Sequence, residues 1–158
     1  MKLPPLVARH ITEAVHGNWT EIYFDDVIAD VTHAEAIAIP LGLTNSIAML
    51  VHHITFYNDV VFERLKGNNP TIDSSNGFAV NIADEEAWQQ LKESCFTSFK
   101  KLADAVAALP EEKLYEPALY NAEDTYYKTF HGIVEHAHYH LGQIVLLKKI
   151  IRNNQFEN

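Results

Sequence analysis

Apolar residues recur at steps of three and four along most of the chain, and strict alternation of apolar and polar residues is scarce. That spacing is the period of an amphipathic α-helix. The pattern predicts four long helices, over residues 3–17, about 44–66, 85–109 and about 125–152. Four long helices in one chain predict an all-α fold of the four-helix-bundle type.

Residues typical of helix ends and turns set the boundaries of the first part of this pattern. Gly17 is placed to end the first helix. A connector then runs to about residue 44, and its residues 24–29 predict a short helical turn. Thr32 and Glu35 have the spacing of a capping box before another short helix, which Pro40 would end. The bundle is therefore expected to carry short accessory turns.

The later boundaries follow the same rules. Thr44, Asn45 or Ser46 can cap the second long helix, and Gly67 ends it. Residues 68–83 are rich in Gly, Asn, Ser and Pro, and loops of that length are usually functional or mobile. Asp84 can cap the third helix; Pro110 closes it and opens a second connector that reaches about residue 124. No element is predicted for that connector.

Composition narrows the class of protein. A length of 158 residues predicts one domain, residues 1–158. A net charge of −9 without a basic block argues against a nucleic acid or an anionic membrane as a partner. A single cysteine, Cys95, excludes an intramolecular disulfide, and neither a signal peptide nor a membrane-spanning segment is recognised. We therefore expect a cytoplasmic globular protein. Its nine histidines nearly match the 12 Lys and Arg residues.

The last long helix carries four of these histidines within ten residues. At about 100° per residue, His136 and His140 share one face at an edge of the apolar stripe. His131 and His138 fall on the polar side. Two histidines one turn apart can direct one nitrogen each at a single ion, but a bare His-x-x-x-His motif more often has a surface or structural role. Both interpretations stay open at this point.

The second long helix adds a candidate third ligand. His53 shares its face with a mostly apolar stripe that includes Tyr57, whereas His52 is turned about 100° away. If the stripe faces the core, His53 points inward, and burying its ring without a partner would cost on the order of 1–3 kcal/mol. A metal ion, a tyrosine hydroxyl or a backbone carbonyl could satisfy it.

A di-iron site of the ferritin type is the strongest competing metal site. Glu13 with His16, and Glu135 with His138, both form Glu-x-x-His motifs. Such a site also takes a glutamate from each of two further helices, for which Glu63 and Glu93 are available. The positions of these residues around the helix argue against this site, because Glu135 and His138 lie on the polar side of the last helix.

Other chemistry is thinly represented in the sequence. It contains no Gly-rich phosphate loop, no Gly-x-Ser-x-Gly and no His-Glu-x-x-His. Cys95 lies on the apolar stripe of the third helix, which favours an inert buried thiol. His10 and His33 have no partner that the sequence can reveal, so solvated side chains are expected.

The order and spacing of several segments resemble the DinB/YfiT-like superfamily of bacterial proteins. The resemblance covers most of the chain. The segments that carry it are Gly17-Asn18-Trp19, residues 44–54 with His52-His53-Ile54, Arg64-Leu65-Lys66-Gly67, and His136-Ala-His-Tyr-His140-Leu-Gly-Gln143.

The resemblance implies a four-helix bundle with a long crossover, which the first connector could accommodate. It also implies a three-histidine site for a divalent metal such as Zn, Ni or Fe, with His53, His136 and His140 as ligands, and it favours His53 over the neighbouring His52. Many relatives have Arg where this chain has Leu141, so a substrate contact from that position is not expected here.

Members of this family resemble metal-dependent hydrolases or transferases of low-molecular-weight thiols. The resemblance thus implies a small-molecule substrate, at a metal with an open coordination position. Gln143, Tyr57 and Trp19 are candidates for the pocket wall, although core packing is the expected role of Tyr57 and Trp19. Glu135, the only acid beside a ligand, should point away, which favours thiol activation over hydrolysis. A non-catalytic bundle that binds a metal or a partner is the alternative, and a homodimer is expected in either case.

Overall fold

The computed structural model describes residues 2–154. It contains α1 (Leu3–Glu13), α2 (Phe24–Ala29), α3 (His33–Ile37), α4 (Ile47–Leu65), α5 (Glu85–Ala107), the 3-10 helix η1 (Glu111–Tyr115), β1 (Pro117–Ala118), β2 (Asn121–Thr125) and α6 (Tyr126–Asn154). The predicted all-α fold is confirmed, with a small hairpin added. No helix among these residues is both long and apolar enough to cross a membrane.

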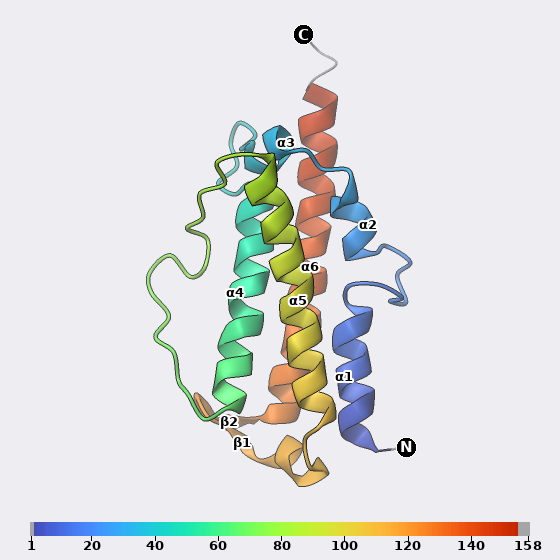
Figure 1. Ribbon diagram of the computed structural model, residues 1–158, viewed down its shortest axis with the longest axis vertical. Coiled ribbons are helices and arrows are strands. Elements are labelled where there is room, and N and C mark those ends of the chain that lie inside the picture. The colour runs from blue at the N-terminus through green and yellow to red at the C-terminus, as the bar shows by residue number, and fades with distance from the viewer. Residues whose placement is uncertain (1, 155–158) are drawn as a thin grey trace.

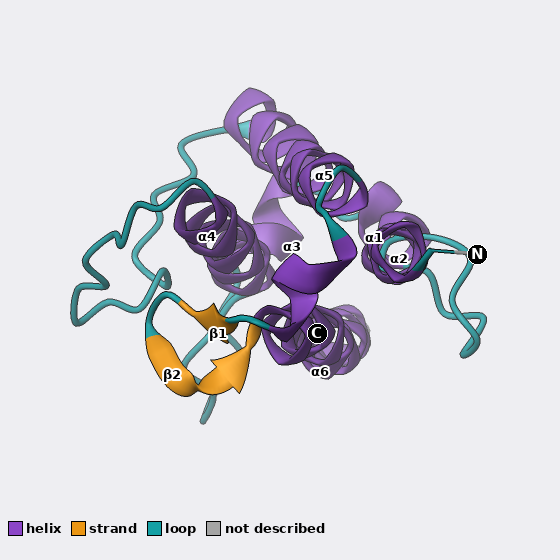
Figure 2. Ribbon diagram, turned by 90° about the horizontal axis from the view of Figure 1, so that it is seen from below, coloured by secondary structure: helices purple, strands orange, loops and turns teal. Residues whose placement is uncertain are grey.

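The four long helices surround one apolar core. Helix α5 packs against α1 and α4, and α6 closes the other side between the same two helices. An end-on view shows this arrangement (Figure 2). The core is built from fully buried large side chains contributed by all four helices, among them Ile11, Leu50, Trp88, Phe99, Phe130 and Ile144. The helical spacing of the apolar residues therefore places their side chains inside the bundle.

The direction of the helices locates the long crossover. Helices α1 and α6 run one way along the bundle, and α4 and α5 run the other way (Figure 1). Two adjacent parallel helices need a connection that returns along their whole length, and residues 66–84 make it, as the green trace in Figure 1 shows. The first connector, which by its length could have accommodated the crossover, does not form it, because it joins helices that run in opposite directions.

Three predicted helix starts are confirmed by their caps. The Thr32 hydroxyl accepts a hydrogen bond from the Glu35 amide, and the Glu35 carboxylate accepts one from the Thr32 amide, which completes the capping box. The side chains of Ser46 and Asp84 cap α4 and α5. Helix α1 is shorter than predicted, since it ends at Glu13 and residues 14–17 continue as turns.

The second connector folds into elements that the sequence did not predict. Residues 111–115 form η1, which buries Leu114, and residues 117–125 form the antiparallel β1–β2 hairpin. The amide of Tyr126 donates to the carbonyl of Glu116, which ties the start of α6 to this segment. A strand of two residues is too short to show an alternation of apolar and polar positions, which explains the missing prediction.

Candidate metal centre

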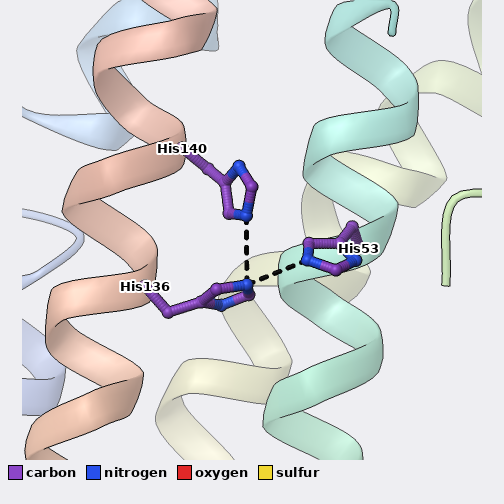
Figure 3. Close-up of side chains that lie close together, drawn as sticks. All are labelled: His53, His136 and His140. Carbon is purple, nitrogen blue, oxygen red and sulfur yellow. Dashed lines mark hydrogen bonds between the residues drawn. The ribbon is translucent and has the colours of Figure 1, made fainter. Parts of the chain in front are cut away.

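The structure brings together the three histidines that sequence analysis singled out. His53 extends from α4, and His136 and His140 extend from adjacent turns of α6 (Figure 3). The side chains of His53 and His140 are buried, with exposed fractions of 4% and 5%, and His136 is half-buried. Helices α4 and α6 pack side by side, so two residues far apart in sequence come to face one another.

The Nε2 atoms of the three rings converge on one point. The Nε2 atom of His136 lies 2.9 Å from that of His53 and 3.1 Å from that of His140. Three nitrogens at about 2.0–2.1 Å from one Zn²⁺ would lie roughly 3.0–3.4 Å from each other. The separations in this cluster therefore approach those of a shared metal ion, and the cluster could hold one.

Hydrogen bonds at the far side of two rings fix which nitrogen carries the proton. The Nδ1 atom of His53 donates to the carbonyl oxygen of Asn76 at 2.6 Å, and the Nδ1 atom of His140 donates to Oε1 of Gln143 at 2.7 Å. A neutral ring that donates from Nδ1 has a bare lone pair at Nε2. Two bare lone pairs thus face the His136 Nε2 atom, which has at most one proton to share. A metal ion, which can accept all three lone pairs, therefore suits these three nitrogens better than a single shared proton does.

The turn over residues 73–78 of the crossover supports the cluster. Asn76 and Gly77 adopt left-handed backbone conformations, with φ of 53° and 75°, and their carbonyl groups accept from Nδ1 of His53 and of His52. The ring of Phe78 stacks on His53 with centroids 4.0 Å apart. Sequence analysis flagged this loop by its length but missed these contacts. The Asn-Gly pair is the turn signal that could have indicated them.

Burial lowers the pKa of all three imidazoles. For His136 burial is the main cause, and the neighbouring His140 and His53 add electrostatic repulsion, so its pKa falls to about 4. Desolvation also lowers the pKa of His53 and of His140. The rings are therefore neutral near pH 7, the state in which imidazole binds a metal.

A cavity of about 500 Å³ opens beside the cluster along the groove between α4 and α6. Its wall includes the predicted Tyr57, whose ring lies edge-on to His53 and whose hydroxyl donates to the side-chain oxygen of Asn76. Gln143 contacts the cluster as the acceptor for His140. Residues that sequence analysis missed complete the wall at the other end, notably Arg64, Tyr120, Asp124, Lys128 and Tyr139.

Two assignments of the sequence analysis are corrected by the structure. Trp19 was expected in the core or near the site, but its side chain is 97% exposed and does not line the cavity. It lies in the turns that follow the early end of α1, which direct the indole outward. Glu135 was expected to point away; its carboxylate does pair with His131 at 3.3 Å, yet the residue also lines the cavity.

Most of the remaining histidines have other partners. His52 bonds to the Gly77 carbonyl and stays outside the cluster, His138 bonds to the Val134 carbonyl, and His16 pairs with Asp25. His33, expected to be solvated, is half-buried and bonds to the carbonyl of Ile82. His10 is exposed, as expected.

The carboxylates of the competing di-iron site do not come together among residues 2–154. The described chain holds only two groups of potential ligands close enough for one ion: the three histidines, and the more exposed group of His16, Asp25 and Asp26. Glu93 is exposed, and Glu63 pairs with Lys66. Cys95 is fully buried, and burial raises the pKa of its thiol to about 12, which agrees with an inert core thiol.

Comparison with known proteins gives one match. A family model described as the DinB superfamily matches residues 18–144, most of the chain, including all three histidines of the cluster. No curated protein and no solved structure matches the chain.

Proposed function

This chain belongs to the DinB superfamily, and we propose that it is a metal-dependent enzyme that transfers a small thiol. His53, His136 and His140 would hold a divalent metal such as Zn, Ni or Fe. The observation that carries the proposal is the convergence of three neutral Nε2 atoms at the wall of a cavity of about 500 Å³.

The donor set determines which chemistry the metal supplies. Three neutral imidazoles leave a divalent cation its full charge and at least one open position, where it lowers the pKa of a thiol or a water molecule. Structural zinc sites, in contrast, usually have four protein ligands. A three-histidine set beside a cavity therefore supports catalysis.

The residues around the cluster favour a thiol over water as the nucleophile. Hydrolysis generally needs a base that takes up a proton, and Glu135, the acid next to the ligands in sequence, has its carboxylate 3.3 Å from the ring of His131, although the residue lines the cavity. Tyr57 donates its hydroxyl proton to Asn76. A thiol depends on such a base less than water does, because its ordinary pKa is far lower and metal binding alone would release its proton to solvent. Its sulfur then forms a bond to an electrophilic carbon, and the leaving group departs with the electron pair of the broken bond.

The decisive experiment compares metal content and transferase activity in three untagged proteins. Wild type and the His138→Ala variant should retain about one metal ion per chain, because His138 lies on the same helix but bonds to the Val134 carbonyl. The His136→Ala variant should lose nearly all of it. A coupled assay of low-molecular-weight thiols with an electrophile should show turnover in the first two proteins only.

The other outcomes separate the alternatives. Metal in wild type without turnover of any thiol would favour the non-catalytic binding protein. Turnover of an ester or amide by the metal-loaded protein would favour a hydrolase. Equal, near-zero metal in wild type and His136→Ala would exclude the site itself.

A further inference from the structure

The groove between α4 and α6 extends from the three histidines to a cation at its other end. On α4, Arg64 follows His53 by eleven residues, close to three full turns, so both residues lie on the groove side and line the same cavity. Their Cα atoms are separated by roughly 16 Å of helix rise. Helical side chains tilt toward the N-terminus, which directs the guanidinium back toward the histidines.

The guanidinium of Arg64 lacks an anionic partner within the described chain. None of the ion pairs or side-chain hydrogen bonds found among residues 2–154 involves it, and its Nε atom is buried without a hydrogen-bond partner. Buried donors without acceptors cost on the order of 1–3 kcal/mol, so such an atom needs an explanation.

Tyr120 from the hairpin holds Arg64 in place. The guanidinium carbon lies 4.0 Å from the centre of the Tyr120 ring, and the Tyr120 hydroxyl lies 3.3 Å from the Thr129 hydroxyl on α6. Stacking orients the planar guanidinium but supplies no negative charge. The unpredicted β1–β2 hairpin therefore positions a cation at the end of the groove.

None of the acids of the cavity wall forms an ion pair with this cation among residues 2–154. The Asp124 carboxylate accepts from Asn121 at 2.8 Å, and the Glu135 carboxylate pairs with His131. Lys128, the second cation of the wall, makes no side-chain ion pair with any residue of the described chain. Neither cation of the wall is thus held by an anionic side chain of the described residues.

Between the two ends the groove is open at Gly132. This residue lines the cavity one turn before His136, and a Cβ built on it would meet no atom within 4 Å. A ligand can therefore lie along α6 from the histidines toward Arg64.

We propose that the groove binds an elongated small molecule that carries a carboxylate, with Arg64 holding the carboxylate and the three histidines defining the reactive end. A carboxylate fits because the planar guanidinium can bind its two oxygens in parallel. This assignment rests on the proposed function for the identity of the reactive end, and it adds the substrate class.

The test uses two probes that differ only at one end. Both 6-mercaptohexanoate and 6-mercaptohexanol are titrated calorimetrically into zinc-loaded protein. In wild type the acid should bind about tenfold more tightly than the alcohol, a difference of about 1.4 kcal/mol. In Arg64→Gln the two affinities should agree within about twofold, whereas Arg64→Lys should retain part of the preference.

Lys66→Gln is the matched control. It removes the same charge two residues further along, from a side chain that pairs with Glu63 and does not line the cavity. Its preference for the acid should equal that of wild type. Equal binding of acid and alcohol by wild type, or an undiminished preference in Arg64→Gln, would overturn the assignment.

A second pair of variants tests the path between the two ends. Gly132→Leu should weaken binding of 6-mercaptohexanoate at least tenfold, because the new side chain enters the groove. Gly142→Leu makes the same change on an exposed turn of α6 and should leave binding unaltered. Unaltered binding in Gly132→Leu would contradict the proposed path.

The outcomes also separate this inference from the proposed function. If binding of the thiols does not depend on zinc, the proposed function fails, while the ratio of acid to alcohol affinity still decides the role of Arg64. If binding depends on zinc but not on Arg64, only the carboxylate site fails. Binding of neither probe would count against both.

Discussion

Two clusters of potential ligands differ in almost every property that governs metal binding. The three histidines between α4 and α6 are mostly buried and neutral, and hydrogen bonds from outside the cluster orient two of them, His53 and His140. In the other cluster, His16 is exposed and its Nδ1 atom bonds directly to both carboxylate oxygens of Asp25, at 3.0 and 2.9 Å. Proximity of donor atoms is common to both.

The two clusters show that short distances between donor atoms are not enough for a metal site, because the lone pairs of these atoms must also be free. In the exposed cluster the histidine already has its partner, so a metal would have to displace an existing hydrogen bond. In the buried cluster the hydrogen bonds engage Nδ1 and leave the Nε2 lone pairs directed at one another. The turn over residues 73–78 produces this orientation for His53, which gives the long crossover a role in the site.

We expect the largest effect from distorting the turn over residues 73–78, because this should weaken metal binding at the buried cluster only. In Gly77→Ala, a side chain would enter the left-handed region at φ 75° and approach the Phe56 ring to 2.7 Å. We expect a loss of about 1–3 kcal/mol in the free energy of unfolding and a 10- to 100-fold loss of zinc affinity, because the His53 hydrogen bond is displaced. Urea unfolding and competitive zinc titration measure the two effects.

Gly67→Ala is the control for backbone strain. Gly67 also has a positive φ, of 89°, but an added Cβ there meets no atom within 4 Å. It should lose a similar amount of backbone stability and keep its zinc affinity. Unchanged zinc affinity in Gly77→Ala would show that the turn does not orient the cluster.

The response of the metal-free protein to pH should be the next largest effect. The pKa of His136 is about 4 in the folded chain, below the roughly 6.5 of an unfolded chain, so the unfolded state binds more protons between those values. The free energy of unfolding should therefore decrease as the pH falls from about 6.5 to 4. Partial exposure of the ring limits the loss to on the order of 1–2 kcal/mol.

Urea unfolding at a series of pH values checks this dependence. His136→Gln removes one of three rings whose pKa is lowered by burial and should make the curve shallower, whereas His138→Gln, two residues away, should not. Saturating zinc should move the loss of stability to lower pH, because protons and metal compete for the same lone pairs. A wild-type stability that stays constant over this range would contradict the burial of neutral rings.

Helical periodicity predicted the four-helix architecture and placed the three histidines on, or at the edge of, apolar helix faces. The repeat of 3.6 residues determines which side chains share a face, but grouping His53, His136 and His140 as one ligand set also required the family resemblance. Caps at Thr32, Ser46 and Asp84 were equally readable, since each depends on residues close in sequence. Helix caps and the helical repeat of apolar residues are thus enough to predict most of the helices.

Contacts between distant segments could not be predicted in the same way. The carbonyl of Asn76 reaches His53 through a backbone conformation, which leaves little trace in residue type beyond the Asn-Gly turn signal. Arg64 lies on the His53 face by spacing, but only the hairpin residue Tyr120 reveals that its cation is held in the groove. The thiol substrate and the homodimer stay predictions.

The smallest expected effect concerns the exposed cluster. Asp25→Asn weakens the contact with His16, whose side chain is 59% exposed, so we expect a loss of at most about 0.2–1 kcal/mol. Asp26→Asn is the control, because it removes a neighbouring charge from the same first turn of α2 without contacting His16. The difference between the two variants in urea unfolding isolates the His16–Asp25 pair.

High salt should shrink that difference, because ions screen exposed pairs. Metal content should be unaltered in both variants, since neither touches the three histidines. Loss of bound metal in Asp25→Asn would place an ion at the exposed cluster and reverse the contrast drawn between the two sites. Loss of the metal in His136→Ala but not in Asp25→Asn would instead show that the metal binds at the buried cluster, where the donors are neutral and are oriented by hydrogen bonds from outside.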